Sequence, residues 1–291
     1  MKTKFLSLLA AVILTHFCYG QNFPAPSAAT GVTPLKCQVE LSDIQAAIDR
    51  GVFRSFSPDN LLRKTSTKVV RMIYLVPADR EVNEAYRISI GESAKHLQKW
   101  YYDQLNIQKS FHLRSPVVEV FKTSHKSDWY STNTNGDLFV QFWNNVLSDG
   151  FAVSGGKFND PDNIYVFYID ADPACGQCGG CGAPGVVVIG ANDLRGMVGQ
   201  EAKAICPNEN IWKFGPCRFV GGLGHELGHA LNLPHPPGCD QGQNTCDNGS
   251  VMWTGLYNYP NAYFNTAEKE SLANHPFITS LNLTIAGEFR N

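Results

Sequence analysis

Three histidines and a glutamate lie close together within residues 224–235, which read GHELGHALNLPH. His225 and His229 are four residues apart, so a helix would place them on one face with Cβ atoms roughly 5–6 Å apart. Two imidazoles at this spacing can reach one zinc ion, at about 2.0–2.1 Å from each nitrogen. Glu226 follows the first histidine directly and would lie beside the ion without binding it. The segment therefore predicts a metal site with an adjacent, proton-accepting carboxylate.

His235 supplies a third ligand if the helix ends soon after His229 and the chain turns back towards the metal. Asn232 and Pro234 predict that end, because asparagine tolerates the left-handed backbone conformation and proline cannot continue a helix. A zinc ion lowers the pKa of its bound water to about 7, and Glu226 can move the protons of a hydrolysis. The residues therefore predict peptide-bond hydrolysis at one zinc ion held by the three histidines.

This segment resembles the signature of the metzincin peptidases, HExxHxxGxxH, with Asn232 in the position of the family's glycine. Asparagine is the best substitute for glycine at a positive φ angle. Further along the chain, Ser250, Val251 and Met252 resemble the methionine turn that lies beneath the zinc in the same family. By this resemblance Met252 is an apolar floor under the metal and not a ligand.

The metzincin resemblance extends more loosely over residues 68–278. It implies a secreted zinc endopeptidase with Glu226 as its general base and a protein or peptide as its substrate. It also implies an α+β fold, with a twisted mixed sheet and helices in an upper lobe, an active-site helix, and a small irregular lower lobe that ends in a C-terminal helix. By the same resemblance residues 186–189 form the edge strand that pairs with an extended substrate.

Two other functions stay open at this point. In a gluzincin-like peptidase, Glu268 or Glu270 would replace His235 as the third zinc ligand. Alternatively, a metzincin-like module would bind protein partners without cleaving them. The presence of Glu226 argues against such a silent module, because binding alone needs no general base.

The elements that must position these residues follow an α/β pattern. The apolar run 69–76, which Pro77 ends, predicts a buried strand, and apolar residues at intervals of three and four predict a helix over 82–105. Asn265 and Glu268 predict the N-terminus of the last helix through a capping box. The remaining expected elements are strands at 117–121, 164–169 and 186–189, and helices at 138–147 and from about residue 218. This order indicates a mixed sheet covered by helices.

The N-terminal part of the chain predicts export. Residues 1–20 have two lysines, then a mostly apolar run and a short polar end, which is typical of a secretory signal peptide. We expect residues 21–67 to be a pro-segment or an N-terminal wrap, and residues 68–291 to be the catalytic domain. No stretch of the sequence is long and apolar enough to predict a membrane span of roughly 18 residues or more. The expected location is outside the cell or in a periplasm.

Charge and cysteine content narrow the class of protein further. The formal net charge of −2 disfavours nucleic-acid binding, which calls for a basic face. The chain has nine cysteines, and loss of Cys18 with the signal peptide leaves an even number, which predicts disulfides in an exported protein. The pairs that are easiest to join along the chain are Cys206 with Cys217 and Cys239 with Cys246.

The remaining cysteines could serve other roles. Cys175, Cys178 and Cys181 form a CxxCxxC array, for which disulfides are favoured over a second metal site because three thiols are too few for a closed one. Cys37 lies in the expected pro-segment, where a cysteine could bind the zinc and keep the enzyme latent.

Overall fold

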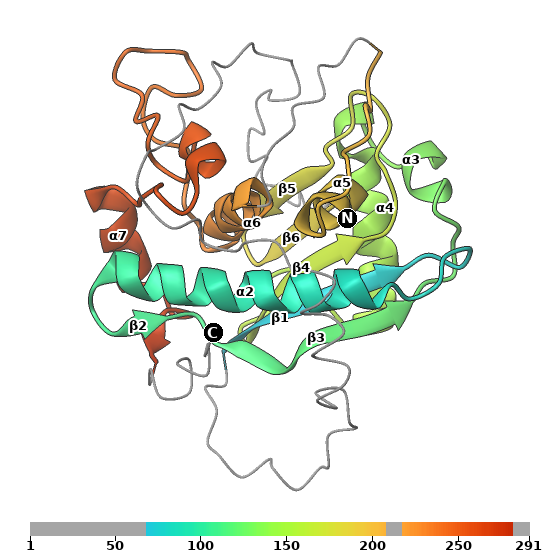
Figure 1. Cartoon of the computed structure of the whole chain (residues 1–291), viewed down its shortest axis with the longest axis horizontal. Helices are drawn as coiled ribbons and strands as arrows, with labels where there is room; N and C mark the ends of the chain where they lie inside the picture. The colour runs from blue at the N-terminus through green and yellow to red at the C-terminus, as the bar shows by residue number, and fades with distance from the viewer. Residues whose placement is uncertain (1–67, 208–216, 282–291) are drawn as a thin grey trace, which may run out of the picture.

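A five-stranded sheet forms the centre of the structure, a computed structural model that describes residues 68–207 and 217–281 (Figure 1). Its neighbouring strands run parallel except for the last pair, which is antiparallel. The sheet is therefore mixed and mostly parallel, and helices cover it, as the sequence predicts for the fold class. Across the sheet the strands are β3 (Leu113–Lys122), β1 (Val69–Val76), β4 (Asn163–Ile169), β6 (Val186–Ile189) and β5 (Gly180–Ala183).

Helices cover both faces of the sheet, and in Figure 1 α2 lies in front of it and α4 behind. The helices are α2 (Glu84–Leu105), α3 (Trp129–Thr132), α4 (Leu138–Ser154), α5 (Ala191–Met197), α6 (Cys217–Ala230) and α7 (Thr266–Ala273). A 3₁₀ helix, η2 (Thr254–Asn258), follows α6, and β2 (Lys109–Ser110) pairs with β7 (Thr279–Ser280) in a second small sheet.

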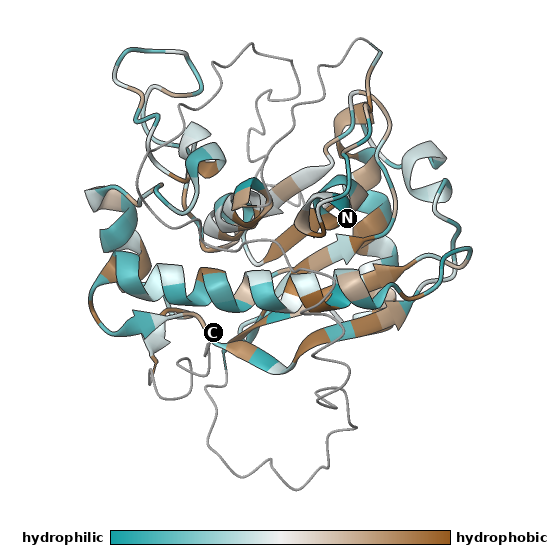
Figure 2. Ribbon diagram, viewed as in Figure 1, coloured by the Kyte–Doolittle hydropathy of each residue, from teal (hydrophilic) through white to brown (hydrophobic). Residues whose placement is uncertain are grey.

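Two apolar cores lie on the two sides of the sheet, because alternate residues of each strand point to opposite faces. In β1, Met72 and Tyr74 pack with α2 and α6, whereas Ile73 and Leu75 pack with α3 and α4. Strands buried on both faces need continuous apolar sequence, which explains the run in β1. Figure 2 shows hydrophobic residues concentrated in the central strands, whereas hydrophilic and hydrophobic residues alternate along α2.

Local sequence signals set the ends of several helices. The side chain of Asn83 caps α2 by accepting a hydrogen bond from the backbone N–H of Ala85 at 3.0 Å. The capping box predicted for the last helix is present, since Asn265 and Glu268 bond each other's backbone N–H groups at the start of α7. These caps supply partners for backbone groups that have none within the helix.

The edge of the sheet differs from the sequence prediction. Residues 186–189 form β6 as expected, but this strand pairs with β4 on one side and with β5 on the other. The edge strand is β5, which lies within a segment rich in cysteine and glycine that lacks the apolar pattern of a strand. The prediction that β6 pairs with substrate is therefore wrong, because its backbone groups are already used on both sides.

The disulfides also correct one expectation. Cys206 pairs with Cys175, so the predicted bridge between Cys206 and Cys217 is wrong, and Cys217 is disulfide-bonded elsewhere. Contacts distant in sequence decide this pairing: Lys203 binds Asn192 and Asp172, which brings the chain after α5 back to the C-terminal end of β4. The other bridges are Cys178–Cys181, within the CxxCxxC array, and the expected Cys239–Cys246.

Several expectations concern residues outside the described part of the chain. The signal peptide at 1–20, the pro-segment or wrap at 21–67 and the latency role of Cys37 all lie there. Within the described ranges, no helix combines the length and the apolar composition needed to cross a bilayer.

A buried ion pair links β1 to β3 and gives a test of the fold. Arg71 donates to both carboxylate oxygens of Glu119 at 2.8 Å, and the arginine is 6% exposed. Replacing Glu119 with alanine would leave this guanidinium buried with one of its partners gone, so we expect Glu119→Ala to lower the free energy of unfolding by about 3 kcal/mol. Urea denaturation monitored by circular dichroism measures the change.

The matched control is Glu92→Ala, which removes an exposed ion pair with Lys95 on α2. Exposed pairs contribute little, so this variant should change the free energy of unfolding by less than about 0.5 kcal/mol. Equal losses of stability in the two variants would contradict the claim that Glu119 stabilises the fold by pairing with the buried Arg71.

Candidate metal centre

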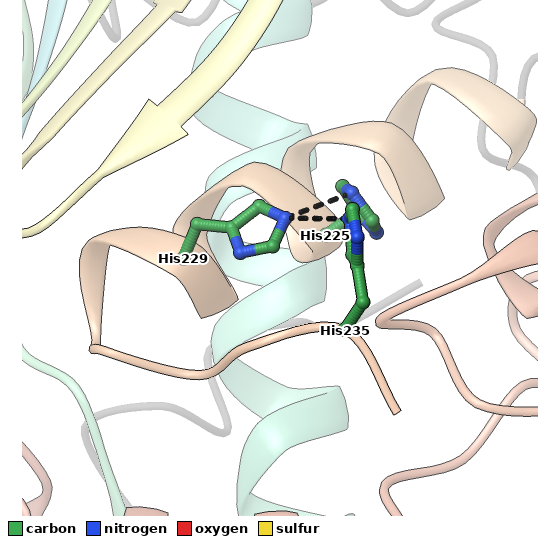
Figure 3. Close-up of side chains that lie close together, drawn as sticks. All are labelled: His225, His229 and His235. Carbon is green, nitrogen blue, oxygen red and sulfur yellow. Dashed lines mark hydrogen bonds between the residues drawn. The ribbon is translucent and has the colours of Figure 1, made fainter. Parts of the chain in front are cut away.

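Helix α6 and the turn that follows it bring three histidines together (Figure 3). The helix ends at Ala230, and Asn232 adopts a φ of 65°, in the left-handed region that the sequence predicts for a helix stop. The chain then turns back, so that ring nitrogens of His225, His229 and His235 all lie within 4.8 Å of one another. The structure therefore brings together the residues that the spacing of the segment predicts as metal ligands.

The three rings share one arrangement of their nitrogens. Nε2 of His229 lies 3.1 Å from Nε2 of His225 and 3.2 Å from Nε2 of His235. Each Nδ1 points outward to an oxygen: the carbonyl of Val251 at 3.0 Å from His225, the carbonyl of Leu233 at 2.8 Å from His229, and Asp240 Oδ1 at 2.7 Å from His235. The ring nitrogens are thus divided into an inner set and an outer set.

This arrangement fixes where the protons are. Carbonyl oxygens and a carboxylate can only accept hydrogen bonds, so in the neutral imidazole each Nδ1 carries the ring proton and each Nε2 carries a lone pair. The dashed lines in Figure 3 join the inner nitrogens, but three unprotonated nitrogens have no hydrogen to share. The two separations from Nε2 of His229, 3.1 and 3.2 Å, are close to the roughly 3.3 Å between nitrogens around a tetrahedral zinc ion with bonds of about 2.0–2.1 Å. The cluster can therefore bind a metal ion.

The electrostatic environment keeps the rings in the form that binds metal. Burial, together with the neighbouring rings of His229 and His235, holds the pKa of His225 well below its usual range. Burial and the adjacent His235 lower the pKa of His229 to about 4. Both rings are therefore neutral near pH 7, as a metal ligand must be.

Glu226 lies on α6 beside this cluster and against the edge strand β5. The backbone N–H of Gly182 lies near the Glu226 carboxylate and favours its ionised form, which lowers its pKa. Burial and the nearby Asp193 carboxylate together raise the pKa of Glu226 to about 8, although Arg218 opposes the shift. A divalent cation in the cluster would also oppose it, because positive charge favours the ionised carboxylate. The site therefore holds a carboxyl group whose proton can be moved near neutral pH.

Met252 is fully buried and packs directly against α6. A Cβ atom added at Gly228 would overlap Met252 Sδ. Helix α6 and the segment that carries Met252 can therefore lie this close only because residue 228 is glycine. The backbone N–H of Met252 donates to Ser250 Oγ at 3.0 Å, and the carbonyl of Val251 accepts from His225. The segment 250–252 thus packs against α6 and holds the ring of His225 through the Val251 carbonyl.

The carboxylates of α7 lie outside the histidine cluster. Glu268 accepts from Ser250 Oγ at 2.8 and 2.9 Å and from the backbone N–H of Asn265, so its side chain holds the methionine turn and the helix cap. Glu270 is exposed on α7. Neither joins the three histidines, so the structure contradicts the alternative in which one of them replaces His235.

Sequence reasoning missed three groups around the site. Asp240 has no sequence signal beyond its place beside Cys239, and its contact with His235 depends on the loop fold. Arg218 and Asp193 form an ion pair at 3.2 Å, although they come from different helices. Gly182 was detectable in principle, because a glycine in a strand marks a close approach of another backbone.

Three comparisons with known proteins bear on the site. No protein-family model matches it. None of the curated proteins matches it either. Among solved structures, it is similar to OgpA from Akkermansia muciniphila, both as the catalytically inactive protein in complex with an O-glycopeptide (glycodrosocin) substrate and as the wild type.

The identity to these two OgpA structures is 16% and 17%, and the TM-score is 0.46 for both. The match covers 74% of this chain and 63% of the OgpA chain, so the chain spans less than two thirds of the length of its structural neighbour. Similarity at this level supports no inference about activity, so the function has to be argued from the residues of the site.

The contact between β5 and α6 gives a test of the site's construction. A Cβ atom at Gly182 would overlap the backbone carbonyl of Glu226 and lie 2.9 Å from Cβ of His229. We expect Gly182→Ala to push the strand away from the helix and to lower the free energy of unfolding by about 1–3 kcal/mol, as overpacking does. Chemical denaturation of the purified variant measures this loss.

Gly180→Ala on the same strand is the control. Its Cβ atom would lie 3.8 Å from Glu226 Oε1, which is an ordinary contact, and the residue is exposed. This variant should keep its stability within about 0.5 kcal/mol of the original chain. The close contact between β5 and α6 is refuted if both alanine variants are equally stable.

Proposed function

We propose that this chain is a secreted zinc endopeptidase of the metzincin kind, which hydrolyses peptide bonds in proteins outside the cell. His225, His229 and His235 hold the zinc ion, and Glu226 is the general base. The single observation that carries this proposal is the convergence of three Nε2 atoms whose partner nitrogens are each bonded outward. An arrangement that serves only packing gives no reason for three lone pairs to face one point.

The donor set fits zinc in a catalytic role. Imidazole nitrogens suit zinc and its neighbours among the transition metals, whereas magnesium and calcium prefer oxygen ligands. Three protein ligands leave a fourth position for water or substrate, which is typical of catalytic zinc sites and not of structural ones. The cysteines near the site do not compete for the ion, because Cys239 and Cys246 are joined to each other.

When bound, zinc would lower the pKa of water and polarise the scissile carbonyl. Glu226 takes a proton from the attacking water as its oxygen bonds to the peptide carbon. The same carboxyl then gives that proton to the leaving nitrogen as the carbon–nitrogen bond breaks, so the glutamate returns to its starting form.

An extended peptide is the substrate that best suits the sheet edge. Within the described residues β5 pairs only with β6, so its other side can accept a further strand. Gly180 and Gly182 of β5 both approach Glu226, so a strand added to β5 would lie close to the glutamate. Pairing through backbone hydrogen bonds would bind peptides with little demand on their sequence.

The remaining organisation follows from the same proposal. Residues 1–20 would be the signal peptide, residues 21–67 a pro-segment or N-terminal wrap, and residues 68–291 the catalytic domain. The three disulfides that join described residues to one another are consistent with an oxidising compartment outside the cytosol. This supports a location that the apolar N-terminal sequence also predicts.

Replacing the general base separates metal binding from catalysis. We expect Glu226→Gln to keep one zinc ion per chain and to lower kcat for casein cleavage by about 10²–10⁴-fold, because the amide cannot accept the water proton. Metal analysis and a casein assay on the same preparation measure both quantities. Full activity of the variant would contradict the assigned role.

Removing the metal tests the alternative of a silent binding module. Dialysis against a zinc chelator should abolish cleavage of a peptide library, and adding zinc back should restore it. His235→Ala should lose the bound zinc as well as the activity, because two imidazoles alone leave the site incomplete. If the zinc-loaded chain binds the peptides but cleaves none, the binding module is the better description.

A further inference from the structure

The third histidine is held differently from the other two. The rings of His225 and His229 bond to backbone carbonyls, one in the methionine turn and one at the end of α6. His235 follows the helix, and its Nδ1 bonds to a side chain, the carboxylate of Asp240, at 2.7 Å. Of the three outer contacts, this one alone can be removed by a substitution that leaves the backbone intact.

The loop that carries Asp240 is closed by its own contacts. The backbone N–H of Cys239 donates to the carbonyl of Pro236 at 3.1 Å, and that of Gln243 donates to Gly238 at 2.9 Å. The bridge between Cys239 and Cys246 closes the loop, and Cys239 is 2% exposed. These turns set the position of Asp240 without any contribution from the rings of the cluster.

The hydrogen bond between Asp240 and His235 favours metal binding by the His235 ring. A carboxylate that accepts from Nδ1–H fixes the tautomer in which Nε2 carries the lone pair, and it makes that nitrogen more basic. The negative charge of the Asp240 carboxylate also offsets the charge of a divalent cation bound to His235, which the neutral carbonyls that bond the other two rings cannot do. Trp253 packs edge-on against the same ring, with centroids 5.0 Å apart, and limits its rotation.

We propose that Asp240 is the positioning residue of the third ligand, which holds His235 in the orientation that binds the metal ion. This inference rests on the proposed function, since it assumes that the cluster binds zinc. Asp240 bonds to the outer nitrogen of His235 and is not one of the converging groups, so it acts through the imidazole. The bridge between Cys239 and Cys246 contributes by holding the loop from which the carboxylate reaches the ring.

The test is the zinc affinity of the full chain, measured by competition with a chromophoric chelator. Asp240→Ala should weaken zinc binding by about 10–100-fold, which is the usual effect of losing such a partner. Asp240→Asn should fall between alanine and the original residue, because its amide oxygen accepts the hydrogen bond but carries no charge. The exposed neighbour Gln241→Ala is the control and should bind zinc as the original chain does.

Thermal unfolding separates positioning from a general structural role. The metal-free Asp240→Ala chain should have the Tm of the metal-free original, and only the increase in Tm on adding zinc should shrink. Unchanged zinc affinity in Asp240→Ala would overturn the inference and leave the proposed function standing. A large fall in the Tm of the metal-free variant would overturn it too. If the original chain binds no zinc, the proposed function itself fails.

Discussion

Each imidazole of the cluster has one nitrogen bonded to an oxygen outside it, and this leaves three lone pairs facing one point. Without the outer bonds, each ring could rotate or change tautomer, and the inner nitrogens would not converge. Two of the oxygens belong to the backbone of the methionine turn and the helix end, and the third belongs to Asp240. The fold around the site can be understood as the means of keeping these three oxygens in place.

Close packing around α6 provides that support. On one side β5 lies so near that a side chain at Gly182 would overlap the helix backbone, and on another Met252 occupies the space that a side chain at Gly228 would need. Glycine weakens a helix by roughly 1 kcal/mol relative to alanine, so its use here indicates that proximity matters more than helix propensity. The same closeness places β5 beside the carboxylate of Glu226, since a Cβ atom at Gly180 would lie 3.8 Å from Glu226 Oε1. Packing and chemistry therefore depend on the same small residues.

The sequence predicts the elements whose signals are local. The helix stop at Asn232, the capping box of α7 and the apolar strand β1 all follow from short patterns, and the structure has each of them. The edge strand β5 was missed because its glycines and cysteines lack the apolar pattern of a strand, and its pairing depends on distant residues. The partner of Cys206 and the contact of Asp240 with His235 are likewise set by how loops return to the sheet and the helix.

The claim that three imidazoles bind one zinc ion is tested most directly by X-ray absorption at the zinc edge of the zinc-loaded protein. The account predicts three imidazole nitrogens and one oxygen as neighbours of the ion, all at about 2.0–2.1 Å. A sulfur neighbour at about 2.3 Å, or fewer than three imidazoles, would contradict it.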